Sequence, residues 1–361
     1  MQRIGFFLPD LSGGGAERML LTIANGFAEE GLPTDLILMS AEGAYLRDLS
    51  PALRLVDLGT RRATRSVAAL RSHLSQSRTG TLISGLDHAN ICATAATLLC
   101  RNPPRLLLSQ RNTLSRSQLT RGPLHRHLTR LALRRADLVL AVSEGVRRDL
   151  IDHAGLAPAR VITTWNPVPT AQIRALAEQP PAPVPGLMRG RPYILGCGRL
   201  VAQKGFDDLI TAWADLGPRS PDLVILGQGP ELARLQALAR SLGGAGRVHF
   251  PGFYENPFAM MRGAALFVLS SHYEGLPGVL IQAMACGTPV VATDCDSGPA
   301  EILQQGRYGD LVPVGDRAAL SKAMAAALRK PKPEGLERRA RDFGAREVIA
   351  RHIEIVRGSH P

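Results

Sequence analysis

Long hydrophobic runs, aromatic residues and paired cysteines are all scarce in this chain. No stretch of its 361 residues approaches the roughly 18 to 20 uninterrupted apolar residues of a membrane span, and aromatic residues make up only 4%. The cysteines form an odd, scattered set without a Cys-x-x-Cys pair, namely Cys92, Cys100, Cys197, Cys286 and Cys295. The sequence therefore argues against a membrane-spanning protein, a disulfide framework and a zinc site.

The beginning of the sequence also lacks the pattern of an export signal. Pro9 and Asp10 interrupt the first apolar residues too early for the hydrophobic region of a signal peptide, so residues 3–8 are expected to form a strand. Scattered cysteines are typical of a reducing compartment. These features predict a cytoplasmic protein.

Acidic residues are absent from residues 101–135, which contain nine arginines in a chain of net charge +12. Arginines interleaved with leucines suit an anionic bilayer surface, where each basic residue gains about 1 kcal/mol. A solvated basic face in an arginine-rich proteome is an equal alternative, since Lys204 is the first lysine of the chain. Nucleic acid is not expected, because the segment has no recognised nucleic-acid motif and no interleaved aromatic residues. Peripheral membrane contact and an ordinary solvated surface both stay open.

Short apolar runs alternate with helical patterns along the chain, in two series. Strands are expected in the first series at residues 3–8, 35–39, 54–58, 81–84, 105–109, 136–142 and 161–164, and in the second at 193–198, 222–227, 248–250, 266–270 and 289–293. Unalternating apolar strands separated by helices are typical of parallel sheets covered on both faces. The chain is long enough for two doubly wound α/β domains.

A proline-rich stretch at residues 178–186 separates the two series and marks the expected linker. We therefore predict an N-terminal domain over 1–180, a linker over 181–190 and a second domain over 191–340. The charged end of the chain, 341–361, is predicted to be a helix that can pack back on the N-terminal domain.

A loop that could bind a phosphate group follows the first strand of each series. Residues 13–15 are three glycines that precede a helix. They can let backbone N–H groups approach a phosphate closely, or they can be no more than a flexible turn between strand and helix. In the second series, Gly198 ends the strand, and Arg199 and Lys204 stand before the next helix. A guanidinium and an ammonium at the carboxyl end of a parallel strand could clamp a diphosphate. We favour this role over two unrelated solvated cations, because open α/β sheets bind their ligands at this end of the strands.

Residues 270–294 combine a buried strand, an acidic and glycine-rich loop, a helix and another strand. The loop 274–278 opens the helix, whose free N–H groups and positive dipole end favour an anion such as a diphosphate. Glu274 is expected to accept hydrogen bonds from sugar hydroxyls. Gln282 lies about two helical turns further on, near the same helix face, where a ribose would fit. The stretch therefore predicts a nucleotide-sugar pocket.

The order of these motifs resembles the retaining GT-B glycosyltransferases, and specifically glycosyltransferase family 4, also called glycosyl transferases group 1. Matching segments cover nearly the whole chain and lie at residues 13–18, 142–145, 166–167, 198–206, 227–229, 252–253 and 274–294. The resemblance implies two Rossmann-like, doubly wound parallel-sheet domains facing across a cleft. It also implies a nucleotide-sugar donor bound mainly by the second domain and an acceptor entering from the first.

By matching position, the resemblance implies that Arg199 and Lys204 hold the donor diphosphate and that Glu274 contacts the transferred sugar. These three are the predicted catalytic residues. Further donor contacts are implied for Gly14, Gly15, Gly198, Gly252, Phe253, Gly275, Leu276, Pro277, Gly278 and Val279. Gln282 departs from the family pattern, which has a second glutamate there for the ribose hydroxyls. Because an amide can still bind a diol, Gln282 is kept as a donor-binding candidate.

Front-face transfer with retained configuration is the mechanism that the resemblance implies. The leaving diphosphate accepts the proton of the acceptor hydroxyl as an oxocarbenium-like centre forms, so no protein base, cofactor or metal is expected. Polar residues after two strands of the first series are the acceptor-side candidates, namely Asp87, His88, Asn90 and Arg111. Their ordinary alternative is a role as solvated or turn-forming loop residues.

These features together predict a glycosyltransferase that moves a hexose or N-acetylhexosamine from a nucleotide-diphosphate sugar, UDP-linked by preference. The expected acceptor is a glycan or lipid-linked intermediate of a cell-surface polysaccharide at the inner face of the membrane. Two alternatives stay open: a nucleotide-sugar-binding GT-B protein without transferase activity, and a GT-B epimerase or phosphorylase. No lysine in a recognisable pyridoxal-phosphate context supports the phosphorylase.

Overall fold

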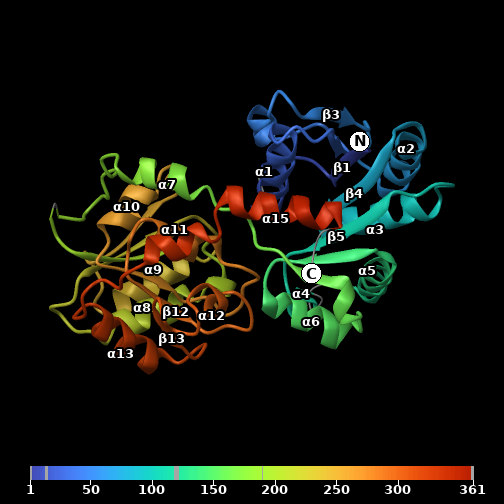
Figure 1. The fold of residues 1–361 in the computed structure, drawn as a ribbon. Coiled ribbons are helices and arrows are strands. Elements are labelled where there is room, and N and C mark those ends of the chain that lie inside the picture. The colour runs from blue at the N-terminus through green and yellow to red at the C-terminus, as the bar shows by residue number, and fades with distance from the viewer. Residues whose placement is uncertain (1, 13–14, 118–121, 189, 359–361) are drawn as a thin grey trace. The chain divides into compact units, whose positions relative to one another are not determined.

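The structure is a computed structural model that describes residues 2–12, 15–117, 122–188 and 190–358. The chain divides into two compact units (Figure 1). Unit 1 contains residues 1–167 and 345–361, and unit 2 contains residues 168–344. Both ends of the chain therefore belong to unit 1.

Unit 1 is built on a seven-stranded parallel sheet in the order β3-β2-β1-β4-β5-β6-β7. The chain runs outward from β1 to β3 and then returns to place β4 on the other side of β1, which is the reversal of a doubly wound sheet. The strands are β1 (Arg3–Leu8), β2 (Thr34–Leu38), β3 (Arg54–Asp57), β4 (Thr79–Gly85), β5 (Arg105–Gln110), β6 (Leu138–Ala141) and β7 (Val161–Thr163).

Helices cover this sheet, and the last of them comes from the end of the chain. They are α1 (Gly15–Glu29), α2 (Ala63–Gln76), α3 (Asp87–Leu98), α4 (Leu114–Ser117), α5 (Pro123–Arg135), α6 (Glu144–Ala154) and α15 (Ala345–Arg357), with short 3-10 turns at Ala44–Asp48 and Pro158–Arg160. Figure 1 shows α15, in red, beside the blue α1. Their contact is close, because a Cβ on Gly26 would lie 2.4 Å from Ile349 Cδ1.

Unit 2 repeats the plan with a six-stranded parallel sheet in the order β10-β9-β8-β11-β12-β13. Its strands are β8 (Tyr193–Cys197), β9 (Asp222–Leu226), β10 (Val248–Gly252), β11 (Leu266–Leu269), β12 (Val290–Thr293) and β13 (Asp310–Val312). Its helices are α7 (Thr170–Ala177), α8 (Phe206–Ala214), α9 (Leu232–Ser241), α10 (Phe258–Gly263), α11 (Gly278–Ala285), α12 (Pro299–Ile302), α13 (Arg317–Ala327) and α14 (Leu336–Arg341), with a 3-10 turn at Ala202–Lys204.

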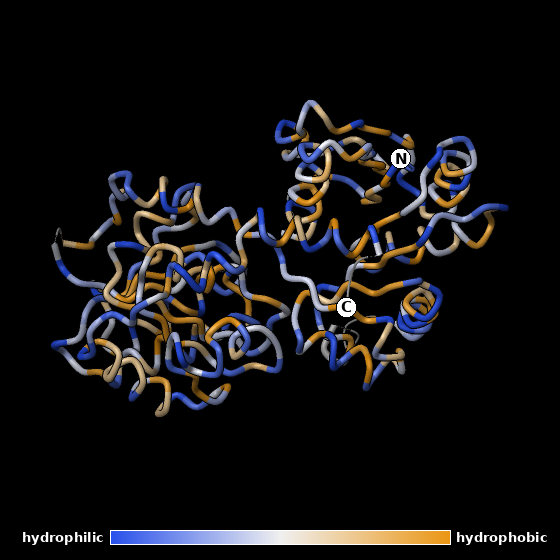
Figure 2. Tube along the Cα trace, in the orientation of Figure 1, coloured by the Kyte–Doolittle hydropathy of each residue, from blue (hydrophilic) through white to orange (hydrophobic). Residues whose placement is uncertain are grey.

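Hydrophobic strands form the centre of each unit. In unit 1 the rings of Phe6 and Phe27 meet edge to face with centroids 5.3 Å apart. In unit 2, Trp213 packs against the core, and its indole N–H donates to the Pro221 carbonyl. Figure 2 shows the matching pattern along the chain, with hydrophobic colours on the strands and hydrophilic colours on outer helices and turns. Among the described residues, no helix has the length and hydropathy needed to cross a bilayer.

The predicted architecture of two parallel α/β domains is confirmed, with one difference in detail. Strand β13 was not expected, and it is a three-residue edge strand that pairs only with β12. One or two helices were expected in the charged segment near the end of the chain, and it forms two, of which α14 belongs to unit 2 and α15 to unit 1.

The expected linker over 181–190 differs from the structure, in which the chain passes from unit 1 to unit 2 at residues 167 and 168. Helix α7, which precedes the proline-rich stretch, packs against α10 and α11 of unit 2. The stretch itself also contacts unit 2, because the Tyr254 hydroxyl donates to the Pro183 carbonyl and Val184 is buried. The prolines therefore mark a surface loop of unit 2, and the terminal segment that joins unit 1 begins at 345.

Candidate active site

Three predicted catalytic residues lie at the carboxyl ends of neighbouring strands in unit 2. Arg199 and Lys204 follow β8, and Glu274 follows β11, which pairs with β8 in the sheet. Ligands of open α/β sheets bind at this edge. The topology therefore brings together residues that are 70 positions apart in the chain.

Gly205 allows the loop after β8 to approach the end of β11 closely. It has a φ of +58°, and a Cβ at this position would lie 2.1 Å from the Ser270 carbonyl oxygen. Any other residue would therefore combine left-handed backbone strain with a steric clash against backbone. The glycine is the N-cap of α8, so it also fixes where that helix begins.

Hydrogen bonds join the loop that carries Lys204 to the loop that carries Glu274. The His272 N–H donates to the Gln203 carbonyl at 2.8 Å, and the Gln203 side-chain amide donates to the Tyr273 carbonyl at 2.8 Å. The Ser270 hydroxyl donates to the Lys204 carbonyl at 2.9 Å. These bonds run in both directions between the two loops, so the loops hold one another in place.

Lys204 and Glu274 form an ion pair, with Lys204 Nζ 2.5 Å from Glu274 Oε1. The exposed fractions of the two side chains are only 16% and 9%. The same carboxylate oxygen accepts a hydrogen bond of 2.7 Å from the Ser271 hydroxyl, and the Thr293 hydroxyl donates to the Ser271 carbonyl. Sequence reasoning placed Lys204 and Glu274 on different parts of the donor and did not predict their pairing or the two hydroxyl residues that support it.

Arg199 differs from Lys204 because its side chain is exposed. Among the residues that the structure describes, its guanidinium makes no hydrogen bond or ion pair. The structure therefore presents one paired and partly buried cation, Lys204, beside one cation that is open to a ligand. Gly198, which precedes Arg199, donates its N–H to the Leu226 carbonyl and so ties the start of the loop to β9.

The loop after Glu274 leads directly into helix α11. Gly275, Leu276 and Pro277 are buried, and Gly278 and Val279 form the half-exposed first turn of α11. The Ser297 hydroxyl donates to the Gly275 carbonyl at 2.7 Å, and this hydrogen bond holds the loop to the segment that follows β12. A Cβ on Gly278 would meet no atom within 4 Å, so there is open space at the start of the helix. The first N–H groups of a helix have no partner in a preceding turn, although the Leu280 N–H here donates to the Pro277 carbonyl at 3.0 Å.

The remaining donor candidates of unit 2 lie on β10 and α11. Gly252 ends β10 with a φ of +91°, and its carbonyl accepts the Gly227 N–H at 2.8 Å. Phe253 follows with an exposed fraction of 68%, which is high for a phenylalanine. Gln282 is half-buried on α11, and its side-chain amide has no hydrogen-bond partner among the described residues.

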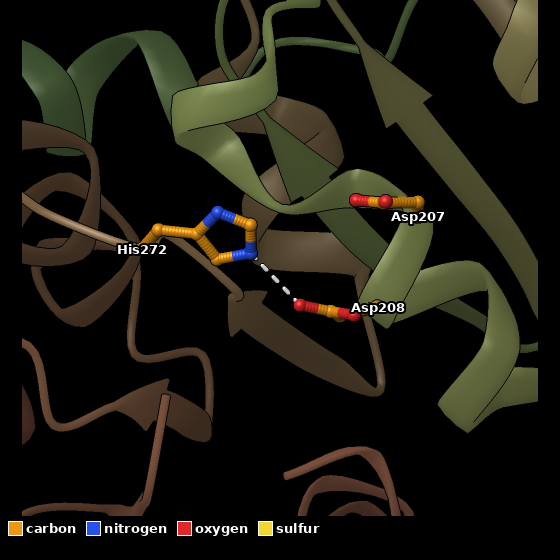
Figure 3. A group of neighbouring side chains, drawn as sticks. All are labelled: Asp207, Asp208 and His272. Atoms are coloured by element: carbon orange, nitrogen blue, oxygen red, sulfur yellow. Dashed lines mark hydrogen bonds and ion pairs between the residues drawn. The ribbon is translucent and has the colours of Figure 1, made fainter. Parts of the chain in front are cut away.

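An acidic pair and a histidine lie next to this site (Figure 3). Asp207, Asp208 and His272 each bring one possible ligand atom within 4.8 Å of the others. Asp208, however, is already bound: His272 Nε2 lies 2.8 Å from one carboxylate oxygen, and Arg317 Nε donates to the other at 2.6 Å. Burial acts to raise the pKa of Asp208, but these two hydrogen bonds outweigh it and lower that pKa below its usual value. The group is an ion-pair network that links α8 and α13 to the Glu274 loop.

The acceptor-side candidates lie at the carboxyl ends of β4 and β5 in unit 1. Asp87 is half-buried, His88 is exposed and Asn90 is buried at the start of α3. Leu86, which precedes them, has a φ of +77°, a strained value for a residue with a side chain. Arg111 directly follows β5, and its Nη1 donates to Asn166 Oδ1 at 2.7 Å.

A polar pocket of about 430 Å³ opens beside His88 in unit 1. Its lining includes residues that follow β1, β2 and β3, among them Asp10, Ser40, Glu42 and Arg61. Arg61 and Glu42 form an ion pair at its edge. Of the two predicted glycines in this unit, Gly15 is the first residue of α1, and Gly14 lies outside the described residues.

Two family models match the chain, one for each series of strands. The model "Glycosyltransferase Family 4" matches residues 13–172, and the model "Glycosyl transferases group 1" matches residues 183–344. The first covers most of unit 1, and the second covers most of unit 2.

Curated relatives resemble the chain over most of its length. The lipopolysaccharide core biosynthesis glycosyltransferase LpsE of Rhizobium meliloti is 28% identical over 86% of this chain and 84% of its own. The N-acetylgalactosamine-N,N'-diacetylbacillosaminyl-diphospho-undecaprenol 4-alpha-N-acetylgalactosaminyltransferase of Campylobacter jejuni is 27% identical over 92% of each chain. Both are glycosyltransferases by name.

Solved structures share the fold at lower identity. The Anabaena protein Alr3699/HepE in complex with UDP matches with a TM-score of 0.80 and 20% identity, over 99% of this chain and 100% of that one. The lipopolysaccharide outer core galactosyltransferase WaaB also matches with a TM-score of 0.80, at 19% identity and the same coverage. The chain belongs to the GT-B glycosyltransferases of the group 1 and family 4 type.

Proposed function

We propose that this glycosyltransferase moves a hexose or N-acetylhexosamine from a UDP-sugar to a glycan or lipid-linked acceptor in cell-surface polysaccharide synthesis, with retention of anomeric configuration. The observation that carries the proposal is the assembly of Arg199, Lys204 and Glu274 beside the start of α11. Complexes of the Anabaena relative with UDP and with UDP-glucose support the choice of donor. The names of the relatives in lipopolysaccharide and undecaprenol-linked synthesis support the choice of acceptor.

The ion pair between Lys204 and Glu274 has a clear use in this reaction. A lysine ammonium has three N–H donors, and Glu274 takes one of them, so Lys204 can hold a donor phosphate without releasing Glu274. The lysine would then set the spacing between the leaving phosphate and the sugar that Glu274 contacts. Arg199 and the positive dipole end of α11 add the positive charge that a departing diphosphate needs.

Retention follows if the leaving diphosphate itself takes the proton of the acceptor hydroxyl on the same face of the sugar. The bond from the anomeric carbon to the diphosphate breaks as the bond to the acceptor oxygen forms. Because the diphosphate is the base, no protein base is required. Since Arg199 and Lys204 supply the cationic charge, we propose that the reaction needs neither a metal nor a cofactor.

A donor screen tests the proposed function most directly. The full-length protein is incubated with each nucleotide sugar, with lipid extract as acceptor, and release of nucleoside diphosphate is measured. We expect release with a UDP-sugar, and loss of release in Arg199→Ala. Binding of a UDP-sugar without release would favour a nucleotide-sugar-binding protein, and full activity of Arg199→Ala would contradict the proposed phosphate contact. The anomeric signal of the product in an NMR spectrum tests retention.

We further propose that residues 101–135 contact the inner face of an anionic membrane. On α5, Leu124 and Leu131 lie seven residues apart with exposed fractions of 71% and 41%, and Arg126 and Arg130 are exposed on the same helix. Exposed leucines beside arginines suit a headgroup surface.

Flotation with liposomes tests this contact. We expect more protein on vesicles with anionic lipid than on neutral ones, and less in the double variant Arg126→Gln, Arg130→Gln. Arg148→Gln, which removes an exposed charge of α6, is the control. Equal partitioning to both kinds of vesicle would contradict the proposal and leave the segment as an ordinary basic surface.

A further inference from the structure

A cavity of about 620 Å³ opens at the amino edge of the sheet in unit 1. Its lining comes from the residue before β1, from the end of α2 and the start of β4, and from the loop between α3 and β5. The strands of this sheet are parallel, so the acceptor-side candidates lie at the opposite edge, roughly 20 Å away along the seven-residue strand β4. The cavity therefore lies apart from those candidates.

The described lining of this cavity contains two cations and no acidic side chain. Arg78 and Arg101 are both exposed, and neither guanidinium makes a hydrogen bond or ion pair with another described residue. The other polar side chains of the lining are hydroxyls, amides and one thiol, namely Gln2, Ser75, Ser77, Thr79, Cys100 and Asn102. Two arginines without a counter-ion favour a bound anion, and the planar guanidinium matches the paired oxygens of a phosphate.

The sequence around the cavity is strongly basic. Residues 58–136 contain fourteen arginines and a single acidic residue, Asp87, which begins α3 at the opposite edge of the sheet. Asp35 lies on β2 in the same sheet, but it is already bound by Arg3 and Arg54. An excess of one sign of charge around a cavity raises the local concentration of the opposite ion. The field of this segment therefore also favours an anion.

A β-bulge shapes one side of the cavity. The pairing of β1 with β4 shifts by one residue near its start, and Gly80 is the extra residue. A Cβ at Gly80 would lie 2.0 Å from Gln2 Oε1 and 2.6 Å from Gln2 Cβ, so glycine is needed for the Gln2 side chain to lie here. Both residues line the cavity. Bulges occur preferentially at sheet edges and beside functional sites, where they redirect side chains.

Hydrogen bonds and prolines hold the walls of the cavity in place. Arg71 Nε donates to the Leu99 carbonyl at 3.0 Å, which joins α2 to the loop after α3. The hydroxyl oxygens of Ser77 and Thr79 lie 2.7 Å apart and share a hydrogen bond at the start of β4. Residues 103–104 are two prolines, whose rings fix φ. A wall that is already ordered needs little further ordering when a ligand binds.

Two exposed leucines stand beside the cavity. Leu98 and Leu99 have exposed fractions of 58% and 57%, and they directly precede Cys100, which lines the cavity. Exposed leucines next to arginines suit the boundary between the headgroups and the acyl chains of a membrane. These leucines therefore favour a phosphate that is carried by a lipid.

We propose that Arg78 and Arg101 bind a phosphate group in this cavity. A phospholipid headgroup is the source that the two leucines favour, and a soluble phosphate ester is the source that the test separates from it. The inference goes beyond the proposed function, because the cavity contains none of the donor or acceptor candidates. A bound headgroup would give unit 1 a specific lipid contact in addition to the surface contact proposed for α5.

Calorimetric titration of the full-length protein with glycerol 3-phosphate tests binding of the phosphate group alone. We expect the double variant Arg78→Gln, Arg101→Gln to bind this probe at least about tenfold more weakly than the wild type, as the loss of charge-assisted hydrogen bonds implies. The matched control is Arg126→Gln, Arg130→Gln, which removes two exposed charges of unit 1 outside the cavity. It should bind the probe as the wild type does. All four arginines are exposed, so both variants should unfold at the temperature of the wild type.

Flotation with vesicles of phosphatidylglycerol tests the lipid as the source of the phosphate. We expect less Arg78→Gln, Arg101→Gln than wild type on these vesicles, and Arg148→Gln, which removes an exposed charge of α6, should float as the wild type does. Arg78→Lys, Arg101→Lys keeps the charge without the planar fork, so it should lie between the wild type and the glutamine variant.

The two assays together identify the source. Reduced flotation of Arg78→Gln, Arg101→Gln with little binding of glycerol 3-phosphate to the wild type assigns the cavity to a lipid. Binding of glycerol 3-phosphate that this variant loses, with unchanged flotation, assigns it to a soluble phosphate ester. Wild-type behaviour of the variant in both assays would overturn the proposal, as would an equal loss of probe affinity in the α5 control. Neither assay measures transfer, so failure to release nucleoside diphosphate from any donor would contradict the proposed function alone.

Discussion

Charged and polar side chains at the carboxyl edges of the two sheets are satisfied in different ways. In unit 2, Lys204 binds Glu274, Ser271 supports Glu274, and Asp208 binds both His272 and Arg317. In unit 1, Ser84, Asn90, Gln110 and Arg111 each have a buried side-chain atom without a hydrogen-bond partner in the described part of the chain, and the helices α2 and α5 hold two more such atoms, on His73 and His125. In unit 2 the side chains of the site therefore hold each other, whereas in unit 1 paired groups such as Arg61 and Glu42 stand beside polar groups that have no hydrogen-bond partner among the described residues.

This difference fits the division of labour that we propose for the two units. Every transferase of this kind must bind a similar nucleotide diphosphate, and a site for a constant ligand can be organised in advance by its own side chains. Acceptors vary, so the groups that recognise them are satisfied by the acceptor. The comparison predicts large losses when the network of unit 2 is broken, and ligand-dependent effects in unit 1.

Breaking the ion pair of unit 2 should have the largest effect. In Lys204→Met, Glu274 is left as a nearly buried charge without its cation, which costs about 3–5 kcal/mol of unfolding free energy. Loss of a group that stabilises the leaving diphosphate should reduce turnover by about 10²- to 10³-fold. Urea unfolding and nucleoside diphosphate release measure the two effects separately.

The double variant Lys204→Met, Glu274→Gln is the control for that experiment. It removes the unpaired charge, so most of the lost stability should return, while turnover should stay low because both functional groups are absent. A double variant that recovers turnover would show that the ion pair serves only the fold. In that case the contrast between the two units would have no link to catalysis.

Acid should destabilise unit 1 at a pH at which unit 2 is still stable. His352 is buried in α15, and burial, together with the nearby charge of Arg111, lowers its pKa from 6.5 to about 4. Its contribution to stability is therefore present above pH 6.5 and is lost as pH falls toward 4, with a total of about 3 kcal/mol. In unit 2 the pKa of Asp208 is lowered below 3.8, so its contribution is lost only at lower pH.

Two tryptophans allow each unit to be followed by itself. Trp165 belongs to unit 1 and Trp213 to unit 2, and the chain has no other tryptophan. Fluorescence of Trp213→Phe therefore reports unit 1, and fluorescence of Trp165→Phe reports unit 2. His352→Asn removes the titrating group but can still donate toward the Val348 carbonyl, so it should flatten the pH dependence of unit 1. An unchanged profile in His352→Asn would contradict this origin of the acid sensitivity.

Much of the fold could be predicted because most strands contain a short run of consecutive apolar residues. Strand β9, with the sequence Asp-Leu-Val-Ile-Leu, is buried throughout and was located from its composition alone. Strand β13 has three residues, only one of them buried, so it has no pattern that separates it from a loop. The domain boundary could not be derived from the prolines, because the assignment of α7 to unit 2 depends on its packing against α10 and α11.

The candidate site was predictable residue by residue but not as an arrangement. Lys204 and Glu274 were identified from their loops, yet their ion pair requires β8 and β11 to be neighbours in a sheet whose order is not that of the chain. Thr293 was predicted only as part of a strand and Ser271 as the residue just beyond the strand 266–270, and their hydrogen bond depends on the pairing of β11 with β12. The roles of Asp208 and Arg317 likewise need contacts between elements 109 residues apart.

The ion-pair network of Asp208 should matter for stability and not for metal binding. Asp208→Asn removes the carboxylate from His272 and Arg317, and the lost charge-assisted hydrogen bonds should cost about 1–3 kcal/mol of unfolding free energy. Because these cations already occupy the carboxylate, EDTA should leave turnover of the wild type unchanged. Loss of turnover in EDTA that a divalent cation restores would instead assign a metal to Asp207, Asp208 and His272, and unit 2 would no longer be a site satisfied by its own side chains.

Substitution of Gln282 should have the smallest effect, and the effect is on UDP affinity. Gln282 sharpens the comparison of the two units, because it lies in unit 2 but, like the polar groups of unit 1, has no hydrogen-bond partner in the part of the chain that the structure describes. It is half-buried, and its amide has no partner among the described residues, as expected for a group that binds a ligand. If its amide oxygen accepts a ribose hydroxyl, Gln282→Glu should bind UDP somewhat more tightly, by less than about tenfold, and Gln282→Ala should bind it more weakly by a similar factor. Calorimetry with UDP and with 2′-deoxy-UDP measures both, and the deoxy compound should reduce the difference between the variants. Equal UDP affinity in the wild type, Gln282→Glu and Gln282→Ala would show that Gln282 does not contact the donor. Arg199 would then be the remaining side chain of unit 2, unpaired within the described residues, that we expect the donor to bind.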